Sequence, residues 1–468
     1  MTPANIFLPI IVTLNMTYLY FWAVAIYAKA HGHIDRSDVS NQEIIDATFT
    51  AARRGDPGKF IIQITTRGGS YQVVARGIDY ALQAAVKYPV LRDIVTIEVI
   101  TEATSDVTEL SADFKSPILP IKYYVLPKDY ETLNGTKFKA RALHYMVEQH
   151  RLNPINAYVV HYDEESVFTP DNLARLCRNL LIKPIGISEG SISYPLEWKD
   201  AHVINRTMES NRPFGCHECY LVMTHPAPLH LHGSNLVIQE RLENAIGWDI
   251  GTYQGNPLIA EDLVFGLNVF IKYGKSAFGW HGVEMLEQPP FTLKASYEQR
   301  KRWVMGALQG VNHIKGLDGY YNLPLAERFK IQTVIRVRVA TYAIGLPVSI
   351  ISLTTWLGTF ALALLDWSIT GDFNVPLTLL AIPGLLMWAG GTQLGLWQNL
   401  RYTDMNKWQK LVEHGKVLLC TPIAGLFDTS GPAVALWKWV TGQRGVKWSP
   451  TPKLAGQEFG DNVSEVLA

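Results

Sequence analysis

The sequence predicts an α/β domain with a mostly parallel sheet, held by α-helical membrane segments on both sides. Two observations lead to this prediction. Three long stretches contain no Asp, Glu, Lys or Arg, at residues 1–28, 339–365 and 373–400. Between the first two of them, short β-rich runs alternate with helical stretches, which is typical of βαβ units.

The charge balance and the cysteine content further limit the class of protein. The 468-residue chain carries 42 basic and 42 acidic side chains, a formal net charge of zero. This balance argues against a nucleic-acid-binding protein, which needs a basic excess, so we expect no nucleic acid partner. Four cysteines are too few for a disulfide-stabilised secreted scaffold. We therefore expect the main domain to face a reducing compartment.

Each charge-free stretch is long enough to cross a bilayer, which takes about 20 helical residues. We predict three membrane helices, at residues 1–30, 339–365 and 373–400. Lys29 and Arg36 follow the first helix, and residues 326–338 form an interfacial basic segment before the second. The positive-inside rule then places the domain in the cytoplasm. The protein is expected to be integral to the membrane, the plasma membrane if the source is prokaryotic.

The remaining boundaries follow from composition. Residues 31–57 are expected to be a linker, and residues 58–325 the folded domain. After the third helix the chain is apolar again, but Asp428 to Pro432 interrupt it. Residues 401–442 are therefore predicted to be an amphipathic and broken or re-entrant membrane segment. Residues 443–468 are expected to form a C-terminal tail.

Three strands are predicted within the domain, with one long helix between the first two. The strands are placed at residues 60–65, 94–101 and 157–162, and the helix at 71–87. Ligands of parallel sheets bind beyond the carboxyl ends of the strands. The residues at those ends are Thr66, Arg67, Glu102 and the acidic run that begins at Asp163.

The acidic run Asp163, Glu164 and Glu165 suggests a cation site. Like charges this close repel one another, and a divalent cation removes the repulsion. Asp163 and Glu165 point to the same side of an extended segment, so they are candidate ligands for Mg²⁺ or Mn²⁺, with substrate phosphate completing the shell. The alternative is a solvated turn after a strand.

Two further clusters follow. Glu261 and Asp262 open a helical segment, where they are either a general base for an acceptor hydroxyl or charges favoured by the helix dipole. A second cluster either contacts a leaving diphosphate and a sugar face or is the positive flank of a membrane helix. It comprises Gln299, Arg300, Arg302 and Trp303.

Cys216 and Cys219 form a C-x₂-C pair with His230 and His232 downstream. Two readings are open: a zinc site, or ordinary buried thiols beside a histidine-bearing loop that lines the donor pocket. The His-x-His spacing is shorter than in most zinc sites.

In this order, the three charged clusters resemble the DxD, ED and QxxRW motifs of the membrane-bound, inverting family 2 glycosyltransferases. The likeness is greatest to egghead-type β-1,4-mannosyltransferases and extends over about residues 58–320. The segments that carry it are residues 66–68, 125–130, 138–143, 161–165, 282–285, 290–293 and 299–303.

The resemblance implies a GT-A, Rossmann-like fold and a donor that is a nucleotide sugar, either GDP-mannose or a UDP-hexose. It implies donor contacts from Thr66, Arg67, Glu102, Lys139, Asp163, Gly233 and Ser234. Asp262, with Glu261 beside it, would be the catalytic base, and Asp163 and Glu165 would hold the metal. The implied acceptor is a glycolipid or growing glycan in contact with membrane lipids, bordered by Gln299, Arg300, Arg302 and Trp303.

Two other functions stay open. A processive β-polysaccharide synthase using a UDP-sugar would carry the same motifs, although three spans and one broken segment offer little material for a polymer channel. The second alternative is not an enzyme: a membrane scaffold that binds a nucleotide sugar without catalysis. The presence of all the acidic and basic clusters argues against it. A transporter would need intramembrane charges, for which only Asp428 qualifies.

Overall fold

The computed structural model describes six stretches of the chain. They are residues 3–102, 104–115, 118–225, 230–370, 376–447 and 451–453. Side chains at residues 3–11, 14, 105, 351–352 and 354–381 fall outside this description. Many side chains of the predicted membrane helices at 1–30, 339–365 and 373–400, and most of the predicted tail, therefore lie outside the description.

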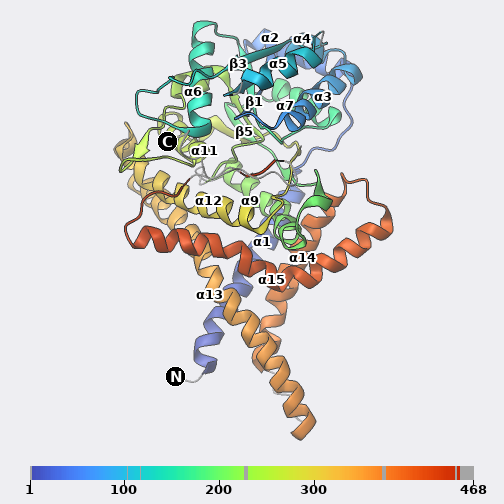
Figure 1. Cartoon of the computed structure of the whole chain (residues 1–468), viewed down its shortest axis with the longest axis vertical. Helices are drawn as coiled ribbons and strands as arrows, with labels where there is room; N and C mark the ends of the chain where they lie inside the picture. The colour runs from blue at the N-terminus through green and yellow to red at the C-terminus, as the bar shows by residue number, and fades with distance from the viewer. Residues whose placement is uncertain are drawn as a thin grey trace.

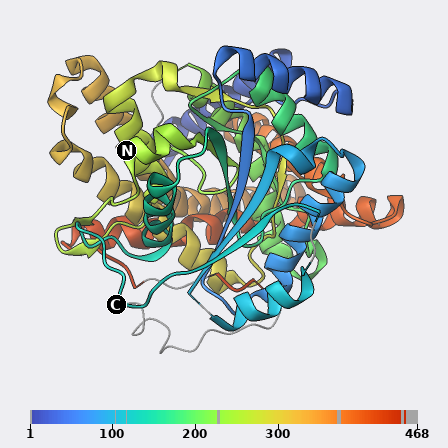
Figure 2. The same ribbon diagram turned by 90° about the horizontal axis from the view of Figure 1, so that it is seen from above.

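A seven-stranded mixed sheet forms the centre of the domain (Figure 2). Its order is β10-β5-β7-β4-β1-β2-β3, and only β7 runs antiparallel to its neighbours. The strands are β1 (Lys59–Thr66), β2 (Val95–Thr101), β3 (Ile121–Val125), β4 (Ala157–Asp163), β5 (Ile187–Glu189), β7 (Leu236–Gln239) and β10 (Phe278–Trp280). The predicted α/β class with a mostly parallel sheet is confirmed.

Two small sheets accompany it, each made of two strands. They pair β6 (Ile192–Ser193) with β11 (Met285–Leu286), and β8 (Thr252–Tyr253) with β9 (Asn256–Pro257).

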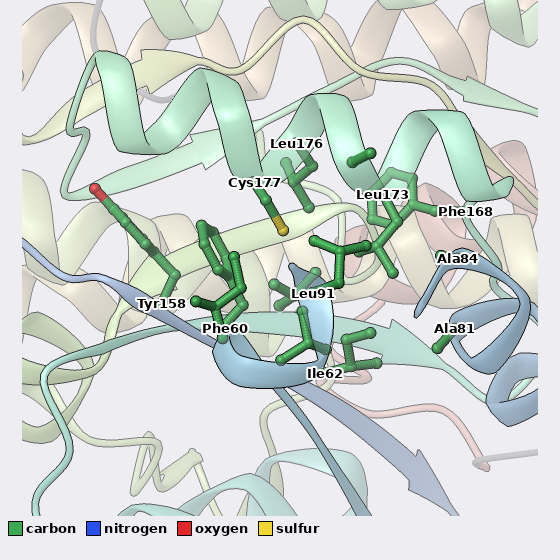
Figure 3. Packing of buried hydrophobic residues seen from close by; sticks show 14 of the residues in the cluster. Phe60, Ile62, Ala81, Ala84, Leu91, Tyr158, Phe168, Leu173, Leu176 and Cys177 are labelled. Carbon is green, nitrogen blue, oxygen red and sulfur yellow. The ribbon is translucent and has the colours of Figure 1, made fainter. Parts of the chain in front are cut away.

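Helices flank both faces of the central sheet (Figure 2). The α-helices of the domain are α2 (Asn41–Arg54), α3 (Tyr71–Lys87), α4 (Leu91–Ile94), α5 (Thr104–Asp113), α6 (Phe138–Leu152), α7 (Pro170–Ile182), α8 (Val203–Ser210), α9 (Arg212–Thr224), α10 (Glu240–Ile246), α11 (Glu261–Tyr273) and α12 (Leu293–His313). The largest buried cluster lies between the sheet and α3 and α7, where the Phe60 and Tyr158 rings stack on each other and Leu176 and Cys177 belong to the same cluster (Figure 3). This core fixes the strand ends that carry the polar residues.

The linker predicted at 31–57 contains a helix. Ser40 and Glu43 form a capping box at the start of α2, in which each side chain accepts a hydrogen bond from the other residue's backbone N–H. Ile44, Ala47 and Ala51 are buried, and α2 packs on α7. This segment therefore belongs to the folded domain.

Four long helices complete the chain: α1 (Pro3–Ala30), α13 (Leu325–Thr370), α14 (Pro376–Leu400) and α15 (Lys407–Val440). Among the described residues, Leu325–Ile350 and Lys407–Val440 are each long and apolar enough to cross a membrane. The basic segment at 326–338 is the first part of α13. Figure 1 shows α1 and α13 extending from the domain on the same side, while α15 runs across them.

Residues 401–442 differ from the predicted broken segment. In the described chain, α15 continues through residues 428–432, with Pro422 and Pro432 inside it. A proline removes one helical hydrogen bond, but contacts with α8, α12 and α13 hold this helix together. Asp428, read as an interruption, accepts a hydrogen bond from Arg300 at 2.5 Å. The charge of Asp428 thus has a buried partner within the continuous helix.

Candidate functional site

The carboxyl ends of β1, β2 and β4 lie side by side. In β1, Thr65 pairs with Asp163 of β4, and Thr66 pairs with Thr101 of β2. Thr66, Glu102 and the acidic run beginning at Asp163 are thus brought to one edge of the sheet. A parallel register requires this, because equivalent strand ends meet at the same edge.

Lys139, from the first turn of α6, neutralises the first carboxylate. Its ammonium group pairs with Asp163 and donates to the carbonyl oxygen of Gly233 at 2.8 Å. Burial opposes ionisation of Asp163, but the positive charges of Lys139 and Lys453 prevail and lower its pKa. Asp163 is therefore held as a carboxylate.

The other two acids of the run have different partners. Glu164 accepts a hydrogen bond from the Thr66 hydroxyl at 2.6 Å, and its pKa is raised by burial. Glu165 pairs with Lys453 at 2.5 Å. The second carboxylate oxygen of Glu165 is buried with no hydrogen-bond partner among the described residues. An unpartnered carboxylate oxygen next to Asp163 fits a hard divalent cation.

Lys453 is a site residue that sequence reasoning missed. It lies in the segment predicted to be a C-terminal tail, yet its ammonium group sits at Glu165, 288 positions away in the chain. Thr451 in the same segment accepts a hydrogen bond from Arg302 at 3.3 Å. No local pattern signals a contact at such a distance in sequence.

Asp262 and Glu261 begin α11, close to the same cluster. Burial and the adjacent Glu261 charge raise the pKa of Asp262 to about 7. Burial also raises the pKa of Glu261, despite the opposing effect of Lys139. The Asp262 Oδ1 oxygen accepts from the Leu263 N–H at 2.8 Å. Asp262 therefore has a basicity suited to accepting a proton near neutral pH.

Gly233 lies between these groups. A Cβ atom built at this glycine would be 3.4 Å from the Lys139 ammonium nitrogen and 3.7 Å from Asp262 Oδ2. The neighbouring Ser234 donates to the buried Glu287, which also accepts from Ser166 at 3.0 Å. Burial, together with the charges of Glu165 and Asp163, raises the pKa of Glu287 to about 7. Sequence reasoning did not select Glu287.

Glu102 and Arg67 lie at the other side of the acidic run. Glu102 pairs with Arg141 of α6 at 2.5 Å. Burial lowers the pKa of Arg67, while the nearby carboxylates of Glu164 and Glu102 oppose this effect. The predicted donor-binding residues Arg67 and Glu102 thus lie near side chains of opposite charge. Arg141, the partner of Glu102, was not predicted as a site residue.

Arg300 and Arg302 of α12 have different environments. Arg300 is buried, and each of its guanidinium nitrogens donates to a side chain, those of Asp428, Ser296 and Glu209. Arg302 lies near Glu261, and burial lowers its pKa to about 10. These contacts give Arg300 a packing role between α8, α12 and α15, while Arg302 borders the acidic cluster.

Gln299 and Trp303 flank these arginines. The Gln299 side-chain oxygen is buried without a hydrogen-bond partner among the described residues. Trp303 is 39% exposed, and the Arg212 guanidinium lies 4.5 Å from the centre of its ring. The arginine covers part of the ring, and the exposed part of the indole is suited to contact with a sugar.

Known proteins provide three comparisons. A family model described as Glycosyl transferase family group 2 matches residues 158–398, just over half of the chain. Beta-1,4-mannosyltransferase egh of Drosophila melanogaster is 30% identical over 196 residues, 40% of this chain and 41% of that protein. Beta-1,4-mannosyltransferase bre-3 of Caenorhabditis elegans is 30% identical over 203 residues, 42% of each.

The chain therefore spans about two fifths of the length of these curated relatives. Among solved structures, S. aureus TarS 1–349 in complex with UDP-GlcNAc aligns with a TM-score of 0.35 and 11% identity. That alignment covers 82% of this chain and 92% of the TarS chain.

Replacing Arg300 tests its packing role. Arg300→Met removes one of the two arginines that pair with the buried Glu209 carboxylate and also removes the partner of Asp428, so the expected loss of folding free energy is about 3–5 kcal/mol. The readout is the unfolding temperature of the detergent-solubilised protein, with Lys294→Met on the exposed side of α12 as control. Adding Glu209→Gln and Asp428→Asn should recover much of the loss. An unchanged unfolding temperature in Arg300→Met would contradict the role.

Replacing Lys453 tests its competition with a cation. In Lys453→Ala the acidic run loses one positive charge, so the apparent Kd for Mn²⁺ should fall severalfold. Calorimetric titration with Mn²⁺ measures it. Lys447→Ala, an exposed lysine of the same segment, is the matched control and should bind as the unmodified protein does. Equal affinities in all three proteins would exclude the competition.

Proposed function

Because the chain belongs to glycosyl transferase family group 2, we propose that it transfers a hexose from a nucleotide sugar to a hydroxyl group of a glycolipid or growing glycan. The single observation that carries the proposal is the position of Asp262. This carboxylate, with a pKa near neutrality, lies beside the Gly233 loop and the Lys139–Asp163 pair.

The proposed donor is GDP-mannose or a UDP-hexose. The names of the relatives egh and bre-3, both beta-1,4-mannosyltransferases, favour mannose. Thr66, Arg67 and Glu102 line the edge of the sheet where a nucleotide would lie. Lys139 would approach phosphate, while Gly233 and Ser234 would bring backbone close to the donor sugar.

The proposed metal is Mg²⁺ or Mn²⁺, held by Asp163 and Glu165. Its chemistry would be neutralisation of the donor diphosphate. Lys139 and Lys453 would have to share these carboxylates with it, since both acids are paired with ammonium groups. Arg302 would add positive charge toward the departing nucleoside diphosphate, because its guanidinium lies near the acidic cluster.

In the proposed reaction, the Asp262 carboxylate accepts the proton of the acceptor hydroxyl. The acceptor oxygen forms a bond to the anomeric carbon as the bond from that carbon to the diphosphate breaks. One displacement of this kind inverts the anomeric centre and gives a β linkage from an α-linked donor. Glu261 stays beside the base, where its charge helps to keep the Asp262 pKa high.

The proposed acceptor lies at a membrane. The two apolar helical stretches Leu325–Ile350 and Lys407–Val440 would place the site near lipid, with the domain on the cytoplasmic side. Gln299 and Trp303 would border the acceptor, and the partial exposure of the Trp303 indole supports contact with a sugar.

Asp262→Asn tests the catalytic base. The amide cannot accept the proton, so sugar transfer should fall by about 10²–10⁴-fold. Transfer is measured with radiolabelled GDP-mannose or UDP-glucose and a glycolipid acceptor in proteoliposomes. Thermal stabilisation by the donor should persist, because the base is not a donor ligand. Asp318→Asn, an exposed carboxylate, is the control. Full transfer in Asp262→Asn would overturn the assignment.

The pH dependence provides a separate test. Only the deprotonated form of Asp262 accepts a proton, so kcat/KM should rise with pH through about 7 and then level off. At pH 6 it should be about tenfold below the plateau for a group of this pKa. The measurement is the initial rate at subsaturating donor between pH 5.5 and 8.5. A flat profile over this range would contradict Asp262 as the titrating base.

A further inference from the structure

A second buried cluster lies beside the candidate active site. Cys216 and Cys219 are one turn apart on α9, and His232 lies on the loop that follows. The candidate ligand atoms of these three residues all lie within 4.8 Å of one another. Both thiols are buried, and His232 is partly buried. Two cysteines and a histidine converging on one point form a donor set typical of zinc.

The spacing of the donor atoms fits a tetrahedral ion. Zinc bonds of about 2.3 Å to sulfur and 2.0–2.1 Å to nitrogen require adjacent ligand atoms about 3.6 Å apart. The Cys219 sulfur is 3.4 Å from His232 Nε2. The same sulfur is 3.1 Å from His230 Nε2, on the same loop. Small movements would therefore bring these atoms to coordination distances.

Glu189 is placed to orient His232. The carboxylate accepts from the His232 backbone N–H, and its second oxygen is 3.9 Å from His232 Nδ1. His232 Nδ1 and this oxygen are both buried without a hydrogen-bond partner among the described residues. A proton on Nδ1 directed at this carboxylate would leave Nε2 unprotonated toward the thiols. Zinc-bound histidines commonly have such a carboxylate neighbour.

His230 is the candidate fourth ligand. Its Nδ1 atom contacts the Arg338 guanidinium of α13, which also pairs with Glu218 of α9. A guanidinium only donates hydrogen bonds, so in this arrangement Nδ1 is the acceptor and Nε2 carries the proton. Coordination through Nε2 thus requires Arg338 to turn fully toward Glu218, a partner that it already contacts.

We propose that Cys216, Cys219 and His232, completed by His230, form a structural zinc site. This site would fix the loop that carries the two histidines to α9. The loop continues directly into Gly233 and Ser234, which contact Lys139 and Glu287. A metal at this point would hold the glycine at the position where the backbone approaches the donor. The site is separate from the Asp163 and Glu165 carboxylates, and it does not depend on the transfer reaction.

Metal analysis of the purified protein tests the proposal. The expected result is about one zinc ion per chain, measured by mass spectrometry after dialysis against Mg²⁺-containing buffer. Cys219→Ser and His232→Gln should each lose most of this zinc, while Cys420→Ser, a cysteine outside the cluster, should retain it. No zinc in the unmodified protein, or full zinc in Cys219→Ser, would overturn the site.

Three further measurements address the ligand set and the folding of variants. Co²⁺ exchanged into the unmodified protein should give a thiolate charge-transfer band, and its absence would contradict cysteine ligation. His230→Gln should weaken zinc binding at least tenfold. Unchanged affinity would remove His230 from the site. If Cys219→Ser cannot be purified, zinc removal from the unmodified protein should lower its unfolding temperature and zinc addition should restore it, whereas no change would overturn the structural role.

Discussion

The site depends on neutralising several buried carboxylates that one sheet edge brings together. Asp163 ends β4 and Glu165 lies in the turn that follows, and Asp262, Glu261 and Glu287 approach them from other parts of the chain. Without compensation, such charges would be protonated or would destabilise the fold. Lys139 and Lys453 provide the compensation, each paired with one acid.

This constraint gives the C-terminal segment a role in the site. Lys453 and Thr451 contact Glu165 and Arg302, so the chain beyond α15 returns to the carboxyl edge of the sheet. Arg300 connects α12 to α15, the helix that precedes this segment, through its ion pair with Asp428. The long helices are thereby connected to the domain through charged contacts as well as apolar packing. Because Lys453 occupies a proposed metal ligand, cation binding at Glu165 would be coupled to the position of this segment.

The sequence predicts the domain interior well and its long-range contacts poorly. The strands ending at Thr66, Thr101 and Asp163 agree with their predictions to within one or two residues, because buried β-rich runs between helical patterns are local signals. The capping box of Ser40 and Glu43 is also local, but composition alone made that segment a linker. The contact of Asp428 with Arg300 and that of Lys453 with Glu165 both join distant parts of the chain. Contacts across more than a hundred residues leave no periodic trace in the chain.

Arg300 and Arg302 show the same limit at the level of single residues. They are two positions apart on α12, so they point in different directions around the helix. One is enclosed by Glu209 and Asp428, and the other faces Glu261 and the C-terminal segment. The sequence motif predicts that both arginines lie near the site. Only the packing of the neighbouring helices gives them different environments. The same reasoning applies to His230 and His232: their short spacing is unusual for zinc, but a loop that turns both imidazoles toward Cys219 brings them within reach of one ion.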